Sequence, residues 1–428
     1  MLPGKFIWKP FLKKALTGHF SSFQMLPQEP AWPKDLVSPG LYLHVPFCKN
    51  LCPYCPYNRI EYNERLFDLY ETAIKKEIDL YSPYLKGYEF TSLYIGGGTP
   101  TVNPQGLLRI LNHLKKSLDV HCDICIELHP ANMGDDCLHS LRDLGVNAIS
   151  IGVESTSDTL LTGLGRSHDS LTAKDAVKRA IRAGFQSLNV DLMFALPSQT
   201  LDDWKTDIDI MLELGVDQIS TYPLFSFPYS ELGVSQRISE VTRPDEKIVK
   251  QMLHYTHEKC IESGLERCAV WSWLRPKKFK FSSITRHHYI GFGPSAASMT
   301  GESFSVNTFD VEAYSQRLNE GRPIALTMPM DKRLEMAYWL YWRVYELKIK
   351  NTSFKKTFGS TANIEKEFGF FFSPLRAMGM VDKTEEGYQI NDSGAYWIHR
   401  LQNEYSLSYI NKLWGACRKN PWPQEARL

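Results

Sequence analysis

Hydrophobic positions after residue 40 alternate between short runs of period two and longer stretches with helical spacing. The short runs predict six strands, at 41–46, 91–96, 122–129, 147–154, 187–193 and 217–223. The longer stretches predict five helices between them, near 63–80, 104–118, 135–144, 169–183 and 201–214. Strands that alternate with helices in this way predict a parallel α/β sheet with right-handed crossovers.

Each predicted strand has one apolar face and one polar face. In 187–193, for example, leucine and valine alternate with Asn189 and Asp191. An open sheet covered by helices on both sides would be apolar on both faces, and a closed eight-stranded barrel would have an apolar interior. We therefore expect a curved, incomplete barrel whose polar lumen holds a ligand. Glu127, Glu154 and Asp191 fall near C-terminal strand ends, where barrel enzymes keep their chemistry.

Two further regions flank this predicted barrel of residues 41–330. Residues 1–40 form an N-terminal arm whose first twenty residues carry four lysines and no acid. We expect the arm to pack on the surface, and a substrate-covering or membrane-touching role stays open. Residues 331–428 predict a small helical, winged-helix-like domain that opens with an aromatic helix at Met336–Val344. Because it lacks a dense basic stripe, we expect a packing lid and no contact with nucleic acid.

Composition narrows the class of protein. The 428 residues are 43% hydrophobic and 23% charged, with a net charge of +1, which is the balance of a globular protein of two to three domains. No apolar run reaches the ~18 residues of a membrane span, so no stable membrane insertion is expected. The chain has nine cysteines, an odd number, and no secretory signal. These features indicate a reducing, cytoplasmic location and no disulfide framework.

Three of the cysteines, Cys48, Cys52 and Cys55, crowd into the loop after the first predicted strand. Three thiolates at this C-x3-C-x2-C spacing can ligate three irons of a [4Fe-4S] cluster, which ordinarily takes four. Residue 57, where a nearby fourth cysteine could stand, is Tyr57, so one iron would stay open to another ligand. A Cys3His zinc site with His44 is an alternative, although zinc cysteines usually come as two separated pairs. Three ordinary buried cysteines are the remaining alternative.

The C-x3-C-x2-C spacing resembles the signature of the radical S-adenosylmethionine (SAM) superfamily. The preceding Tyr-x-His-x-Pro-Phe, from Tyr42 to Phe47, resembles its oxygen-independent coproporphyrinogen III oxidase-like branch. The resemblance extends from about residue 41 to 300 and is weaker towards the C-terminus. It implies a partial (β/α)6 barrel, a [4Fe-4S] cluster on these cysteines, one or possibly two SAM molecules, and a 5′-deoxyadenosyl radical.

Further motifs after the predicted strands resemble the SAM-binding segments of this family. The loop Gly-Gly-Gly-Thr-Pro resembles the one that holds the methionine amine, and Gly-Arg-x-His resembles the stretch whose arginine pairs with the methionine carboxylate. The family's aspartate binds the ribose hydroxyls. A segment that usually ends in glutamine ends in Glu154 here. The implied SAM-binding residues are Tyr42, Gly97, Gly98, Thr99, Glu127, Glu154, Arg166 and Asp191.

The reaction is chosen by elimination among members of this branch. The decarboxylase has a fourth cysteine at the position of Tyr57 and an Arg-Asn-Phe-Gln-Gly-Tyr-Thr-Thr stretch that this chain lacks. The heme chaperone has a His-Asn-x-x-Tyr-Trp stretch where this chain has a segment that ends in His287-His288. We therefore expect radical C-methylation or methylene transfer to an sp2 carbon of an aromatic or heterocyclic substrate. Porphyrin or heme chemistry as an enzyme, and a heme chaperone, are the alternatives.

The substrate and the partners are less defined. We interpret His287 and His288 as a surface pair, with heme ligation as the alternative. The resemblance implies a small-molecule substrate and flavodoxin or ferredoxin as electron donor. Five aromatic residues could line the pocket of a flat substrate or belong to the core: Phe225, Phe227, Tyr229, Trp271 and Trp273.

Overall fold

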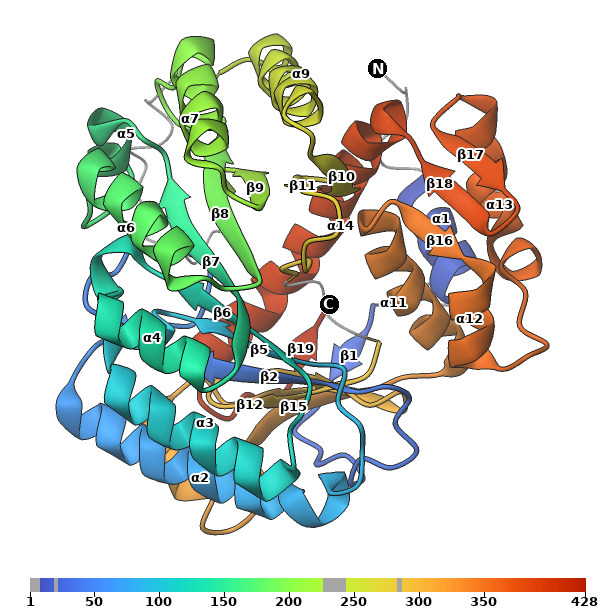
Figure 1. The fold of residues 1–428 in the computed structure, drawn as a ribbon. Helices are drawn as coiled ribbons and strands as arrows, with labels where there is room; N and C mark the ends of the chain where they lie inside the picture. Colours follow the sequence, from blue (N-terminus) through green and yellow to red (C-terminus); the bar gives the residue numbers. More distant parts are fainter. Residues whose placement is uncertain (1–7, 19–21, 226–243, 283–286) are drawn as a thin grey trace.

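The computed structural model describes residues 8–18, 22–225, 244–282 and 287–428, and its centre is a twelve-stranded sheet (Figure 1). Seven neighbouring strands run parallel: β2 (Gly40–Val45), β5 (Ser92–Gly97), β6 (Asp123–Leu128), β7 (Val146–Glu154), β8 (Ser187–Phe194), β9 (Gln218–Pro223) and β12 (Tyr289–Phe292). The first six of these are the strands predicted from the sequence. The α/β partial barrel predicted from the sequence is confirmed.

Antiparallel strands extend the sheet at both edges. On one side β11 (Ser272–Leu274) pairs with β9, and β10 (Glu266–Ala269) pairs with β11. On the other side β13 (Ala297–Met299), β14 (Ser303–Asn307) and β15 (Ile324–Pro329) follow β12 in order. The sequence pattern did not predict these additions, because most of these strands are too short to show a clear period of two.

Helices cover the outer face of the parallel strands (Figure 1). They are α2 (Glu64–Leu85), α3 (Pro104–Leu118), α4 (Asp135–Asp143), α5 (Asp158–Gly163), α6 (Ser170–Ala183) and α7 (Leu201–Leu214), with α9 (Glu246–Glu262) beside α7 and the 3-10 turns η1 (Pro100–Val102) and η2 (Pro130–Asn132) at loop positions. Local sequence sets the helix ends. In α7, Thr200 and Asp203 form a capping box, and Gly215 ends the helix in the left-handed conformation.

The side chains that the barrel strands point inward are mainly polar and form layers. Ser150, Asn189 and Gln218 lie side by side on β7, β8 and β9, because the strand register pairs each with the next. One layer closer to the C-terminal strand ends, Asp191 pairs in register with Ser220. The alternate apolar residues of the same strands belong to the buried core beneath the helices. The side chains that point into the lumen are therefore mainly polar, as the period of two predicted, with an apolar cluster at Cys125 and Ala148.

The C-terminal region adds α11 (Lys332–Tyr345), β16 (Lys348–Lys350), α12 (Asn351–Phe358), α13 (Ile364–Ala377), β17 (Val381–Thr384) and β18 (Gly387–Ile390). Its small sheet has the order β16-β18-β17. This sequence of helices and strands, with a three-stranded antiparallel sheet, is that of a winged-helix-like unit. Smaller elements complete the chain: α1 (Trp8–Thr17), β1 (Gln24–Met25), β3 (Phe47–Cys48), β4 (Ile60–Glu61), α10 (Val311–Arg317) and β19 (Ala426–Arg427).

A single long helix, α14 (Asp392–Lys419), joins the two edges of the large sheet. Near its start, Asp392 accepts a hydrogen bond at 2.8 Å from Arg267 on β10. Near its end, Leu413 and Cys417 pack in one cluster with Val306 and residues of β15. A helix of 28 residues is about 42 Å long, so α14 spans the open side of the partial barrel.

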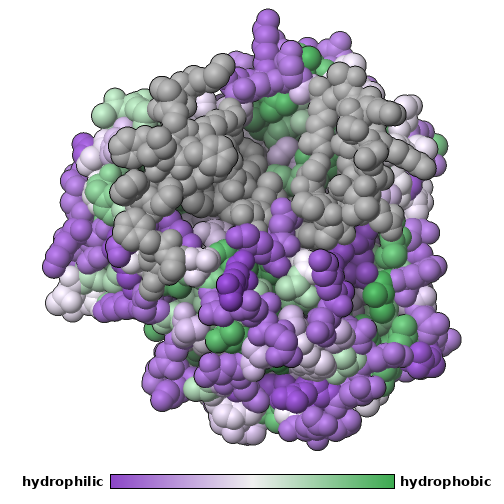
Figure 2. Space-filling view, turned by 180° about the vertical axis from the view of Figure 1, so that it is seen from behind, coloured by the Kyte–Doolittle hydropathy of each residue, from purple (hydrophilic) through white to green (hydrophobic). Residues whose placement is uncertain are grey.

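Within the described residues, no helix is long and apolar enough to cross a bilayer. Figure 2 shows one face whose coloured part is mostly hydrophilic, with separate small hydrophobic patches. The short helix α1 of the N-terminal arm packs against α11, where Arg333 donates to the carbonyl oxygen of Ala15 at 2.7 Å.

Candidate active site

The cysteine loop connects two short strands, β3 and β4, beyond the C-terminal end of β2. β3 ends at Cys48 and pairs in parallel with β4, so that residues 49–59 form a closed loop. The amide of Tyr62 donates to the carbonyl oxygen of Cys48 at 2.8 Å, and the amide of Cys55 donates to that of Cys52 at 3.1 Å. The guanidinium of Arg59 also bonds the carbonyl oxygen of Cys52. Backbone hydrogen bonds therefore hold the loop that carries the three cysteines.

The three thiols lie close enough to affect one another. Burial raises the pKa of Cys55 to about 12, and Cys48 and Cys52 add to the rise. Burial also raises the pKa of Cys48, which a hydrogen bond from Thr99 Oγ1 to its Sγ at 3.6 Å partly offsets. Metal binding to these sulfur atoms must therefore release protons, as it does at other thiolate sites.

His44 is fixed beneath the cysteine loop and takes no part as a ligand. Nε2 of His44 donates a hydrogen bond to the carbonyl oxygen of Asn58 at 2.8 Å. Nδ1 of the same ring therefore accepts one from the hydroxyl of Tyr42 at 2.7 Å. Burial lowers the pKa of His44 to about 4, which keeps the ring neutral. Both ring nitrogens are engaged, and this is the geometry of a loop support rather than of the Cys3His zinc site considered as an alternative.

The glycine-rich loop after β5 packs directly against the cysteine strand. A Cβ atom at Gly98 would lie 2.6 Å from the carbonyl oxygen of Phe47, which is closer than real contacts allow. Gly97 has a φ of 116° and donates its amide to Glu127 at 3.3 Å. Tyr94 also donates to Glu127, whose pKa burial raises. The loop thus leaves backbone exposed to the cavity and holds Glu127 in place.

Arg166 and Glu154 face each other across the cavity wall. The guanidinium lies 3.8 Å from the Glu154 carboxylate and donates to the carbonyl oxygen of Gly152 at 2.5 Å and to Sγ of Cys52 at 3.6 Å. Glu154 has a φ of 66°, in the left-handed region that non-glycine residues adopt uncommonly. It also accepts a hydrogen bond from Tyr222 at 2.7 Å. Nε of Arg166 is buried without a partner in the described residues.

Asp191 is at the centre of a polar network in the lumen. Ser150 donates to its carboxylate at 2.6 Å and Asn189 donates at 3.0 Å. Ser220 in turn donates to Asn189 at 2.9 Å. Burial raises the pKa of Asp191 to about 7. The group is therefore ready to accept hydrogen bonds from a ligand's hydroxyls once it is deprotonated.

The structure brings nearly all of the predicted residues to one cavity of about 340 Å³. The three cysteines, Gly97, Gly98, Thr99, Glu127, Glu154, Arg166 and Asp191 line it. Tyr42 does not, because its hydroxyl is turned to His44. The sequence interpretation did not assign Tyr94, Lys280 and Tyr345, which also line the cavity. Tyr94 lies on the polar face of its strand and could have been found, whereas Tyr345 comes from α11 and no local pattern marks it.

The aromatic candidates divide into two groups. Phe225 and Trp271 line the cavity, with ring centroids 5.9 Å apart. Trp273 does not line the pocket, and the alternative of a core residue is correct for it, because it is fully buried in the main hydrophobic core. Phe227 and Tyr229 lie outside the described residues.

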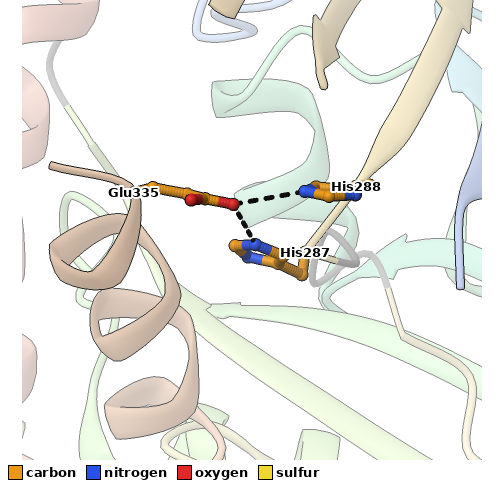
Figure 3. A group of neighbouring side chains, drawn as sticks. All are labelled: His287, His288 and Glu335. Carbon is orange, nitrogen blue, oxygen red and sulfur yellow. Dashed lines mark hydrogen bonds and ion pairs between the residues drawn. The ribbon is translucent and has the colours of Figure 1, made fainter. Parts of the chain in front are cut away.

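The pair His287 and His288 is not a surface pair, so that prediction is wrong. Their side chains are only 8% and 6% exposed, and their Nε2 atoms lie 2.7 Å and 3.3 Å from one oxygen of Glu335 (Figure 3). The amide of Val37 donates to Nδ1 of His288 at 2.8 Å. The proton of neutral His288 is therefore on Nε2, which donates to Glu335 and has no lone pair for a heme iron. The trio connects the barrel to α11.

The cavity fits the groups that the resemblance implies. Three converging thiols fit a [4Fe-4S] cluster, and among the described residues that line the cavity no other cysteine could fill a fourth position. The unpartnered Nε of Arg166 suits a carboxylate, and the backbone cradle at Gly98 has no room for a side chain. Cys48, Cys52 and Cys55 would hold the cluster, while Arg166 and Asp191 would bind SAM.

Comparisons with known proteins agree with this geometry. Residues 42–211 match the model of the Radical SAM superfamily. The heme chaperone HemW of Bacillus subtilis is 25% identical over 387 residues, which cover 87% of this chain and 99% of that protein. The oxygen-independent coproporphyrinogen III oxidase of Escherichia coli is 26% identical over 397 residues, covering 85% and 84%. The solved structure of coproporphyrinogen III oxidase (HemN) from Escherichia coli has the same fold, with a TM-score of 0.75 at 22% identity over 90% of this chain and 96% of that one.

Proposed function

Because this chain belongs to the radical SAM superfamily, in its coproporphyrinogen oxidase-like branch, we propose that it is an enzyme of oxygen-independent porphyrin or heme chemistry. Radical SAM enzymes use a [4Fe-4S] cluster and SAM, which together supply a 5′-deoxyadenosyl radical that removes a hydrogen atom from the substrate. One observation carries the choice of substrate. The two relatives described above align with 85% or more of this chain, and both act in porphyrin or heme chemistry according to their names.

The residues of the chain bind the cluster, orient SAM and shield the radical. Cys48, Cys52 and Cys55 hold the cluster in a loop that is supported by backbone hydrogen bonds. Arg166 pairs with the carboxylate of SAM through its unpartnered Nε, and Asp191 accepts hydrogen bonds from the ribose hydroxyls. The surrounding wall excludes water, which protects a reactive radical from side reactions.

The C-methylation favoured from the sequence finds no support. None of the relatives described above is named a methyltransferase. The decarboxylase and the heme chaperone were set aside because motifs around Tyr57 and His287 are missing. The similarity to these proteins nevertheless extends along most of the chain. Binding of a second SAM molecule stays a prediction.

The cavity wall supports a substrate that contains aromatic rings. Trp271 packs between Phe225 and Tyr345, with ring centroids 5.9 Å and 5.7 Å away, and all three line the cavity. On another part of the wall, Tyr94 packs on Phe281 at 5.5 Å. Aromatic walls of this kind favour contacts with planar aromatic rings, such as the separate pyrrole rings of a porphyrinogen.

The test is an anaerobic assay of the reconstituted protein with dithionite, SAM and coproporphyrinogen III. We expect 5′-deoxyadenosine together with carbon dioxide or an altered porphyrinogen, measured by liquid chromatography and mass spectrometry. A Cys48→Ala variant is the control and should give neither product. S-adenosylhomocysteine in place of these products would contradict the proposal and return the assignment to methyl transfer.

A heme chaperone is the second candidate, because the Bacillus subtilis relative, which aligns with 87% of this chain, carries that name. Hemin that binds tightly at one molecule per chain, without 5′-deoxyadenosine under the same conditions, would favour it. We also propose flavodoxin or ferredoxin as the one-electron donor. The exposed Lys49, directly after Cys48, offers a positive charge to such an acidic partner beside the cluster loop.

A further inference from the structure

One lysine in the cavity wall has no part in the scheme above. Among the described residues that line the cavity, the permanent cations are Arg59, Arg166 and Lys280. Arg59 bonds the carbonyl oxygen of Cys52 and so belongs to the cysteine loop. Arg166 belongs to the SAM end of the cavity. Lys280 is therefore the cation left for the substrate.

The position of Lys280 is fixed by its neighbour in the chain. Gln218, which is 1% exposed, donates to the carbonyl oxygen of Phe281 at 2.9 Å and accepts from the amide of Phe281 at 3.0 Å. These two hydrogen bonds hold the segment 280–282 against the start of β9. The ring of Phe281 packs with Cys125 and Ala148 in the lumen. A side chain on such a fixed backbone can recognise a ligand without ordering a loop first.

The ammonium group of Lys280 has bonding capacity left. It donates to the carbonyl oxygen of Cys268 at 3.1 Å and lies 3.4 Å from the carboxylate of Glu346. An ammonium has three N–H donors, so one is left for a ligand. The carboxylate of Glu346 also pairs with Arg343 at 3.0 Å. Lys280 thus shares the carboxylate of Glu346 with Arg343.

We propose that Lys280 anchors a carboxylate on a side chain of a substrate built from pyrrole rings. The inference rests on the proposed function, since coproporphyrinogen carries propionate side chains on a large ring. The ring contacts the aromatic wall at Trp271 and Tyr345, and one propionate reaches Lys280. The lysine acts as a binding residue that sets which ring edge faces the SAM end of the cavity.

The test measures binding of two fluorescent probes to the reconstituted protein under anaerobic conditions. Coproporphyrin III carries the carboxylates, and its tetramethyl ester has the same ring without them. We expect Lys280→Gln to weaken binding of the acid about tenfold and to leave binding of the ester unchanged. Lys280→Arg should bind the acid within about threefold of the natural protein, because the charge is kept.

Lys278→Gln is the matched control. Lys278 lies two residues away, pairs with Asp217 at 3.0 Å and does not line the cavity, so this variant should bind both probes normally. Equal affinity of the natural protein and Lys280→Gln for the acid would overturn the anchor, while the proposed function would stand. A Lys280→Gln variant that also loses the ester or the cluster absorbance would likewise overturn it, in favour of a structural role. A natural protein that binds neither probe would contradict the proposed function itself.

Discussion

Arg418, ten residues from the end of the chain, donates a hydrogen bond at 2.8 Å to the carbonyl oxygen of Tyr57, two residues after the third cysteine. The same guanidinium reaches the carbonyl oxygen of Pro56 at 3.2 Å. Nearby, Asn58 donates its side-chain amide to the carbonyl oxygen of Phe309 at 2.8 Å. The last helix therefore supports the cysteine loop directly, across the open side of the barrel.

Replacing this arginine should loosen the cluster without unfolding the protein. In Arg418→Ala, two hydrogen bonds from a charged donor to the loop are lost, each worth about 1.5–3 kcal/mol at most. We expect a lower iron content after reconstitution and faster bleaching of the visible absorbance in the presence of a chelator. Lys419→Ala is the control, because that neighbour is exposed and should behave as the natural protein. Identical bleaching rates for both variants would contradict this role.

A glycine substitution tests the close packing beside the cysteines. In Gly98→Ala, the new methyl group would meet the backbone of Phe47 at 2.6 Å, and backbone cannot move aside as a flexible side chain can. We expect a loss of about 1–3 kcal/mol in the free energy of unfolding and little or no cluster assembly. Gly134→Ala provides the comparison, since nothing lies within 4 Å of its added atom. Normal iron content in Gly98→Ala would argue against the packing described above.

The buried Asp191 should give SAM binding a pH dependence. Its pKa is raised to about 7 by burial, so below pH 7 the carboxyl is largely protonated and offers a weaker acceptor to ribose hydroxyls. We expect the Kd for SAM, measured by isothermal titration, to fall as the pH rises from about 6 to 8. Asp191→Asn should bind SAM more weakly and lose this dependence. A variant that keeps the same pH profile would show that another group is responsible.

Glu335 should contribute stability that depends on pH. Burial alone would raise its pKa, but hydrogen bonds from His287 and His288 lower it to about 2, below the usual glutamate value of 4.5. A lowered carboxyl pKa means stability that is fully present above about pH 4.5 and is lost as the pH falls towards 2. Glu335→Gln should therefore cost about 1–3 kcal/mol at pH 7, and the difference should shrink in acid.

Urea denaturation at several pH values measures this effect. Glu320→Gln removes a carboxylate that pairs with Arg317 on the surface at 3.4 Å, and it should change stability very little. If Glu335→Gln and Glu320→Gln are equally stable at pH 7, the buried trio does not hold α11 to the barrel.

The sequence predicted the parts of the site that repeat a local pattern. Alternation of apolar and polar residues predicted which faces of the strands point inward, and so placed Glu127, Glu154 and Asp191 in one lumen. The spacing of the cysteines and their place after a strand predicted the loop that presents them.

Contacts between distant segments left no such pattern. Arg418 and Tyr57 lie 361 positions apart, and no local sequence pattern around either residue predicts their contact. For His287 and His288, polarity suggested the surface, but the pair is buried, and Glu335 from another element pairs with Nε2 of both rings. The added edge strands β13 to β15 were missed because their pairing partners, not their composition, define them.

The central claim is that Cys48, Cys52 and Cys55 hold a [4Fe-4S] cluster with one iron open to SAM. Electron paramagnetic resonance of the dithionite-reduced protein, recorded with and without SAM, tests it most directly. We expect about four irons per chain and a cluster signal that shifts when SAM is added. A protein that holds a single zinc ion, or a reduced cluster whose signal is unchanged by SAM, would contradict it.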